Sequence, residues 1–143
     1  MPPQTLETLF QIAGDLVLPV WLLLLFAPGW RWTQRIATFI LPLLLASLYV
    51  WLLTHGHPVP GAGFRTLQAV RLLFSSPEAL LAGWVHYLAF DLFTGAWEAR
   101  DAVRLKISRW IVAPCLLLTF LFGPLGLAIY LLLRAAMRKQ FTA

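Results

Sequence analysis

The chain has 143 residues, of which 60% are hydrophobic and 12% are charged, and its formal net charge is +5. Soluble domains carry about 25% charged residues and about 45–50% apolar ones, so this composition is typical of a membrane protein without a large extramembrane domain. The Lys and Arg residues cluster between apolar blocks, as cationic residues do beside lipid headgroups. No phosphate-binding loop or interleaved aromatic and basic motif indicates a nucleic acid partner.

Four apolar blocks approach the length of about 20 residues that a bilayer-spanning helix needs. They cover residues of about 5–27, 33–54, 78–95 and 111–133. We therefore predict an all-α membrane protein, a four-transmembrane-helix bundle that forms a single integral membrane domain over residues 1–143. It would cross the membrane several times, in a bacterial inner membrane or a plastid-type membrane.

The segments between these blocks carry headgroup signals. Arg31 and Arg35 lie among tryptophans in the first connection, a mixture typical of the membrane surface. Apolar residues recur at steps of three and four over residues 64–74, which predicts a short amphipathic helix in the interface between the second and third spans. With four spans, five Lys and Arg residues fall on one side and six on the other. Only the first helix favours an orientation, with its C-terminal end in the cytoplasm.

The third block carries ionisable residues at membrane depth. Ser75 or Ser76 would cap its helix, and His86 and Asp91 lie inside the apolar segment. An ionisable residue in hydrocarbon costs roughly 2.5–3.5 kcal/mol, so it marks a working site or a polar network. We expect the helix to reach the surface near Gly95.

Helical spacing divides these residues between two faces. Trp84, Tyr87, Asp91 and Glu98 fall into one stripe, and Gly95 leaves a gap in it that a neighbouring helix or a ligand could fill. His86 lies about 140° from Asp91 on a straight helix, on the side of Phe90. A π-bulge between His86 and Asp91 would bring them to one face, and such bulges are frequent at functional sites.

Each ionisable residue has a structural interpretation and a functional one. His86 is either a neutral imidazole bonded between helices or a catalytic group, and Asp91 is either part of a polar network or a general acid. Asp15 has the depth to join Asp91 from the first helix. Glu98 and Asp101 would lie near the interface, paired with Arg100 or Arg104.

A metal site is the rival interpretation of the histidines. His55, His57 and His86 with a carboxylate would suit iron or zinc. However, His86 would lie about 12 Å along the third helix, away from His55 and His57 at the membrane surface. We therefore predict no metal and no cofactor. In the fourth block, the FGPLG sequence at residues 122–126 predicts a kink or a local unwinding.

The run WVHYLAFDLFTGAWEARD at residues 84–101 resembles the signature of the abscisic-acid-deficient-four-like family of small four-helix membrane proteins. The patterns VLPVWLLLLFAP at residues 17–28 and FGPLGLAIY at residues 122–130 support the resemblance. Plant members are implicated in forming neoxanthin from violaxanthin. This isomerisation needs an acid that protonates the epoxide oxygen and a base that takes a vinylic proton.

The resemblance implies a membrane-embedded, carotenoid-modifying enzyme, an epoxy-carotenoid isomerase that resembles neoxanthin synthase and acts through His86 and Asp91. Asp15 is the third catalytic candidate, and Trp84, Tyr87, Phe90 and Glu98 are the expected substrate-binding residues. The alternative function is a non-catalytic subunit that binds a carotenoid or related isoprenoid, or assists assembly. The expected partners are the lipid bilayer, the carotenoid, and a membrane protein partner or a second copy of the chain.

Overall fold

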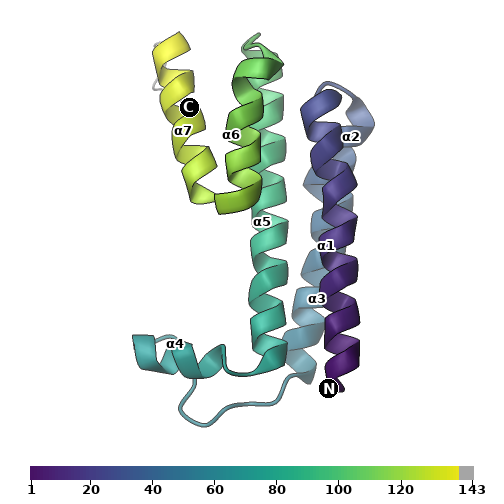
Figure 1. The fold of residues 1–143 in the computed structure, drawn as a ribbon, viewed down its shortest axis with the longest axis vertical. Helices are drawn as coiled ribbons and strands as arrows, with labels where there is room; N and C mark the ends of the chain where they lie inside the picture. The colour runs from purple at the N-terminus through teal and green to yellow at the C-terminus, as the bar shows by residue number, and fades with distance from the viewer. Residues whose placement is uncertain (139–143) are drawn as a thin grey trace.

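The computed structural model describes residues 1–138, which fold into helices joined by short turns and one longer connection (Figure 1). The helices are α1 (Pro3–Phe26), α2 (Arg31–Arg35), the π-helical segment η1 (Ile36–Ile40), α3 (Leu41–His55), α4 (Leu67–Leu73), α5 (Pro77–Arg104), α6 (Arg109–Phe122) and α7 (Pro124–Arg138). The described residues are thus all-α, as predicted.

Three helices are long and apolar enough to cross a membrane: α1, the continuous run Arg31–His55, and α5. The first two match the predicted blocks closely. Within the second, the π-helical turns of η1 lead directly into Leu41 and Pro42. Proline has no backbone N–H to give to the preceding turn, and a shift to wider hydrogen bonding accommodates this loss without ending the helix.

α5 is longer than the sequence predicts. Ser76 caps it by accepting a hydrogen bond from the Ala79 backbone N–H at 3.4 Å, as expected, but the helix continues to Arg104 instead of ending near Gly95. It continues because the acidic residues of its last turns are buried against other helices. Glu98 is fully buried, and Asp101 is 4% exposed.

The fourth predicted span is not a single helix. The chain breaks at Gly123, and α7 runs back beside α6, so the two helices form an antiparallel hairpin along the upper half of α5 (Figure 1). At 1.5 Å per residue, the 14 residues of α6 extend about 21 Å, less than the roughly 30 Å of a bilayer core. The predicted break at FGPLG is present, but it reverses the chain instead of kinking a span.

Tight contacts at small residues hold α7 against α6 and α1 against α5. A Cβ atom on Gly126 of α7 would overlap Thr119 of α6, so the two helices touch there at backbone distance. A Cβ atom on Gly95 of α5 would lie 2.5 Å from the Trp21 ring of α1. The gap at Gly95 is therefore filled by a neighbouring helix, which was one of the two predicted occupants.

The short helix α4 lies within the segment predicted to be amphipathic and projects sideways at the lower end of α5 (Figure 1). Thr66 caps it by accepting a hydrogen bond from the Ala69 N–H at 3.1 Å. Phe64 and Leu67 are more than four-fifths exposed, so this end of the molecule presents apolar side chains outward. The position of α4 in a membrane interface stays a prediction.

Candidate functional site

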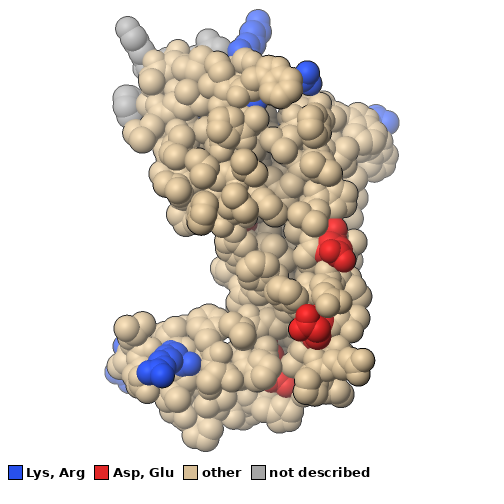
Figure 2. All heavy atoms as spheres, in the orientation of Figure 1, with Lys and Arg blue, Asp and Glu red and all other residues tan. Residues whose placement is uncertain are grey.

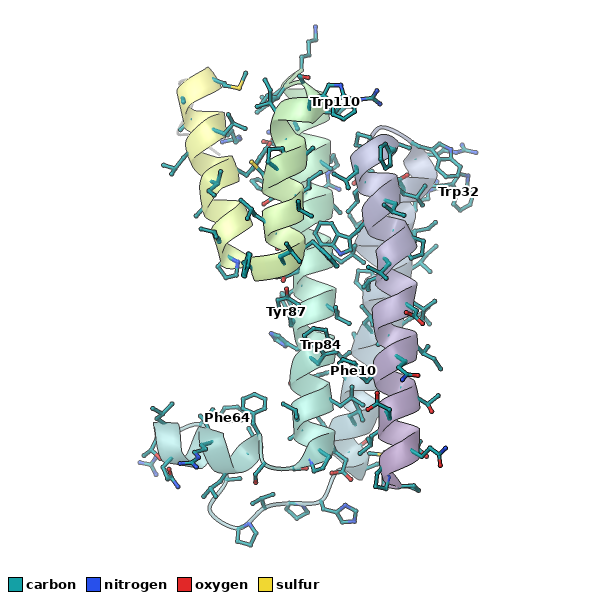
Figure 3. The ribbon with its side chains drawn as sticks, in the orientation of Figure 1. Phe10, Trp32, Phe64, Trp84, Tyr87 and Trp110 are labelled. Carbon is teal, nitrogen blue, oxygen red and sulfur yellow. The ribbon has the colours of Figure 1, made fainter. Side chains whose placement is uncertain are left out.

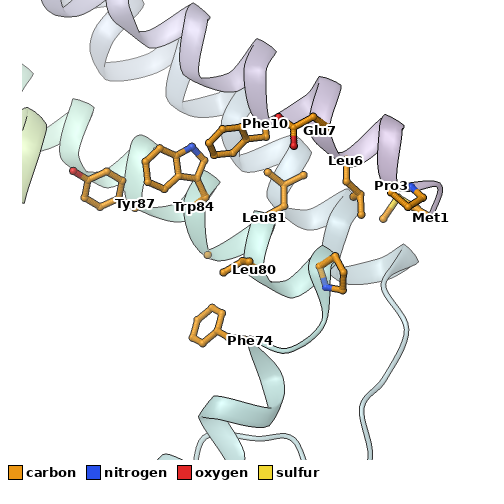
Figure 4. A pocket seen from close by; sticks show the side chains of 12 residues that line it. Met1, Pro3, Leu6, Glu7, Phe10, Phe74, Leu80, Leu81, Trp84 and Tyr87 are labelled. Atoms are coloured by element: carbon orange, nitrogen blue, oxygen red, sulfur yellow. The ribbon is translucent and has the colours of Figure 1, made fainter.

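An apolar cavity of about 680 Å³ lies between the first turns of α1 and the first turns of α5. Leu6 and Phe10 of α1 form one wall, and Leu80 and Trp84 of α5 form the other (Figure 4). Phe74, just after α4, also lines the cavity and lies against Gly83 of α5. The residues that line the cavity are Met1, Pro3, Leu6, Glu7, Phe10, Phe74, Pro77, Leu80, Leu81, Gly83, Trp84 and Tyr87.

The cavity exists because the hairpin turns back halfway along α5. A full-length fourth span would continue down the molecule beside the lower half of α5. Instead, the space-filling view is hollowed between the hairpin above and α4 below (Figure 2). The lining comes from α1, Phe74 and the first part of α5, and the hairpin lies beyond its inner end.

Neighbouring aromatic rings mark the inner part of the cavity. The Trp84 ring lies 5.4 Å from the Phe10 ring and 5.3 Å from the Tyr87 ring, measured between centroids (Figure 3). Trp84 and Tyr87 were predicted as substrate-binding residues, and both line the cavity. Flat, rigid and apolar walls of this kind suit an elongated hydrophobic ligand.

Tyr87 connects the cavity to the hairpin. Its hydroxyl group donates a hydrogen bond of 2.8 Å to the backbone carbonyl of Phe120, in the last turn of α6. The last carbonyls of a helix have no partner within the helix, so this bond satisfies one of them. Tyr87 therefore fixes the tip of the hairpin at the inner end of the cavity.

Asp91 lies one helical turn beyond Tyr87, against the tip of the hairpin. A Cβ atom on Gly123 would lie 2.7 Å from Oδ1 and 2.8 Å from Oδ2 of Asp91, and Gly123 has a positive φ of 45°. Oδ2 is buried and has no hydrogen-bond partner among the described residues. A buried polar atom without a partner is costly, so at Asp91 it indicates a functional group or a missing partner.

His86 lies on a different face from Asp91. α5 is α-helical throughout, without the predicted π-bulge, so the separation of about 140° holds. The His86 ring stacks on Phe90 at 4.5 Å and lies 5.8 Å from the Tyr49 ring of α3. His86 and Phe90 are exposed on the surface of the chain, and neither lines the cavity.

Two other predicted site residues lie apart from Asp91. Asp15 is exposed on α1, where acidic side chains lie on the outer surface of the molecule, so it does not join the cluster (Figure 2). Glu98 is fully buried between α5 and α6, and its two carboxyl oxygens accept from the Thr119 hydroxyl at 3.0 Å. It lies within the helix packing, and its hydrogen-bond partner is Thr119 instead of the expected Arg100 or Arg104.

Asp101 anchors α7 to the end of α5. It accepts hydrogen bonds from Tyr130 at 2.8 Å, from Arg134 at 2.8 Å and from Arg104 at 2.6 Å. The pairing with Arg104 was predicted, and the two α7 partners were not. Because each oxygen of Asp101 has a partner, the residue has a structural explanation that Asp91 lacks.

The three histidines do not come together. His57 approaches Glu78 at 3.5 Å, and His55 stacks on the Trp51 ring at 5.2 Å, whereas His86 contacts Phe90. Within residues 1–138, no three His, Cys, Asp or Glu side chains lie close enough to hold a metal ion. The His-rich set considered from the sequence is therefore not assembled in this chain.

Sequence reasoning missed the α1 wall of the cavity and the role of Gly123. Phe10 carries no signal of its own in an apolar block, and its place beside Trp84 depends on how α1 packs. Gly123 has a local signal, because glycine before proline marks a turn. That signal does not reveal the contact with Asp91, which is 32 residues away in sequence.

The chain matches the family model described as ABA DEFICIENT 4-like over residues 8–130. This match covers most of the sequence and includes most of the cavity lining, Asp91 and the hairpin tip, so the chain belongs to that family. No curated protein and no solved structure gives a match. The resemblance inferred from residues 84–101 is confirmed.

The contact between Gly123 and Asp91 predicts a large loss of stability for Gly123→Ala. The alanine Cβ would overlap the carboxyl group, and the positive φ adds roughly 1–2 kcal/mol of backbone strain. Gly29→Ala is the matched control, since its Cβ would meet nothing within 4 Å. Thermal unfolding of the purified protein in detergent should show a clearly lower Tm for Gly123→Ala and little change for Gly29→Ala. Equal Tm values would contradict the close approach of Gly123 to Asp91.

Proposed function

We propose that this member of the ABA DEFICIENT 4-like family is a multi-pass membrane enzyme that isomerises an epoxy-carotenoid, with Asp91 as its acid and base. The observation that carries the proposal is the unpartnered Oδ2 of Asp91, one turn beyond an apolar, aromatic cavity. An apolar ligand with a polar ring end fits this arrangement. Its polyene would lie against Phe10 and Trp84, and its ring would reach Tyr87 and Asp91.

The surroundings of Asp91 suit a group that changes its protonation state. The last turn of α6 and the first turn of α7 meet at Gly123, beside the carboxyl group. Free carbonyls at the end of one helix can accept from a neutral carboxyl group, and free N–H groups at the start of the next can donate to a carboxylate. Half-helices that end in mid-membrane supply such groups in transporters as well.

Opening the epoxide to an allene requires one proton to reach the oxygen and one to leave a neighbouring vinylic carbon. A neutral Asp91 would protonate the epoxide oxygen as the C–O bond breaks. The resulting carboxylate would then take the vinylic proton, so Asp91 would return to its starting form and the reaction would be balanced. The Tyr87 hydroxyl group, held by Phe120, would orient the ring end.

This assignment differs from the pair of His86 and Asp91 suggested by the sequence. His86 points toward Phe90 and Tyr49, so one ring end could not contact both groups. A non-catalytic carotenoid-binding subunit is the second candidate function. The exposed position of Trp84 and the apolar lining of the cavity favour a binding subunit as much as an enzyme, because neither feature requires a reaction.

Asp91→Asn should abolish product formation. The chain would be expressed in a bacterium that makes violaxanthin, and pigments would be separated by chromatography. General acid–base catalysis contributes typically 10²–10⁴-fold, so product should fall at least about 100-fold in Asp91→Asn and persist in His86→Ala. Product formed by Asp91→Asn at the wild-type level would contradict the assignment. Unchanged violaxanthin that co-purifies with the wild-type chain would favour the binding subunit.

Filling the cavity tests where the ligand lies, whether or not it reacts. Leu80 lines the cavity and is 58% exposed, while Leu53 on α3 is 54% exposed and lies outside it. Leu80→Trp should lower both the co-purified carotenoid and any product, and Leu53→Trp should leave both unchanged. Absorbance of the purified protein at carotenoid wavelengths measures bound pigment. An equal effect of the two substitutions would place the ligand elsewhere.

A further inference from the structure

The hairpin changes which side of the membrane each cationic residue occupies. In a four-span chain, the C-terminal residues Arg134 and Arg138 would lie on the same side as Arg65 and Arg71. Because α7 turns back at Gly123, it ends instead beside the start of α6 (Figure 1). The near-balance of charges that the sequence suggests therefore does not hold for this fold.

The redistributed charges are strongly asymmetric. The end of the molecule that holds the α1–α2 turn, the α5–α6 connection and the end of α7 is the cationic end. Its residues are Arg31, Arg35, Arg100, Arg104, Lys106, Arg109, Arg134 and Arg138. Among the described residues, the opposite end has only Arg65 and Arg71, on and before α4.

Aromatic residues place the cationic end at headgroup level. Trp32 and Trp110 both lie at this end (Figure 3). The Arg35 guanidinium group lies 5.2 Å from the Trp32 ring, and the Arg109 group lies 5.1 Å from the Trp110 ring. Both rings are exposed, at 40% and 68%. Exposed tryptophan with arginine is the usual composition of a membrane–water boundary.

We infer that the chain inserts with this cationic end in the cytoplasm, so that the ligand cavity opens into the non-cytoplasmic half of the bilayer. Short connections rich in Lys and Arg stay on the side from which the chain inserts, and eight against two is a decisive bias. The first helix alone favours the same orientation. The N-terminal end of α1, the 56–66 connection and α4 then lie on the opposite side.

The depth of the cavity follows from its lining. Its α5 residues run from Pro77 to Tyr87, and its α1 residues end at Phe10, so all belong to the end opposite the cationic one. Asp91 lies midway along α5, about 20 Å from either end. The cavity therefore occupies the non-cytoplasmic leaflet, with Asp91 at the midplane. Its use by a carotenoid from that leaflet rests on the proposed function.

Cysteine labelling in the full-length chain tests the orientation. In a Cys115→Ala background, single cysteines would be introduced as Pro60→Cys, in the 56–66 connection, and Ser108→Cys, beside α6; both native residues are exposed. A membrane-impermeant maleimide added to intact bacterial cells should label Pro60→Cys at once. It should label Ser108→Cys only after the inner membrane is opened. Detergent-lysed cells give the full signal for each.

A fluorescent protein fused to the C-terminus of the full chain should fold and fluoresce, because α7 would end on the cytoplasmic side. Labelling of Ser108→Cys in intact cells, or of both positions equally, would overturn the proposal. So would a C-terminus on the same side as Pro60, because that result indicates four spans. None of these measurements needs a ligand. The proposed function can therefore fail in the pigment assay while the orientation holds, and the orientation can fail while the proposed function holds.

Discussion

The chain reverses direction at Gly123. This glycine packs against Asp91, which lies midway along α5, the longest helix. Backbone groups at such a turn are tolerated within a membrane only when protein covers them or when they line a cavity. Here Gly123 is buried, Tyr87 binds the Phe120 carbonyl, and the carboxyl group of Asp91 fills the space that a side chain at position 123 would need. The turn therefore depends on glycine at position 123, and the Tyr87 hydroxyl group binds one of the carbonyls that the turn leaves free.

The remaining features follow from this turn. Because α6 and α7 are short, their polar partners must lie in the upper half of α5. Glu98 binds Thr119 there, and Asp101 binds Tyr130 and Arg134. The lower half of α5 does not pack against a fourth span; it lines the cavity together with α1. The same reversal moves Arg134 to the cationic end. Hairpin, cavity and charge asymmetry are thus three consequences of one change in chain direction.

Local signals in the sequence predicted much of the fold. The apolar blocks identified α1, the Arg31–His55 run and most of α5, Ser76 was one of the two expected caps, and FGPLG marked the break. The reversal was not predictable, because glycine and proline indicate where a helix stops and not where the chain goes next. Its direction depends on distant contacts, such as those of Gly123 with Asp91 and of Arg134 with Asp101.

The candidate site was predicted in part for the same reason. Helical spacing grouped Trp84, Tyr87, Asp91 and Glu98 on one side of α5. Trp84 and Tyr87 line the cavity, Asp91 lies one turn beyond it, and Glu98 is buried against α6. Depth along the chain did not predict the facing of Asp15, which continues an exposed polar stripe of Gln4, Glu7 and Gln11 on the outer side of α1. Position along the bilayer normal and direction around the helix axis are separate quantities, so a residue at the right depth does not by that alone face the site.

The distance between the two ends of the hairpin tests the account most directly. Spin labels at Trp110→Cys and Met137→Cys, in a Cys115→Ala background, would occupy two exposed positions near the ends of α6 and α7. Helices packed side by side lie about 8–10 Å apart, so electron spin resonance in bilayers should give a distance of roughly 10–20 Å. A continuous fourth span would separate these positions by about 40 Å. That longer distance would contradict the hairpin, the origin of the cavity and the orientation together.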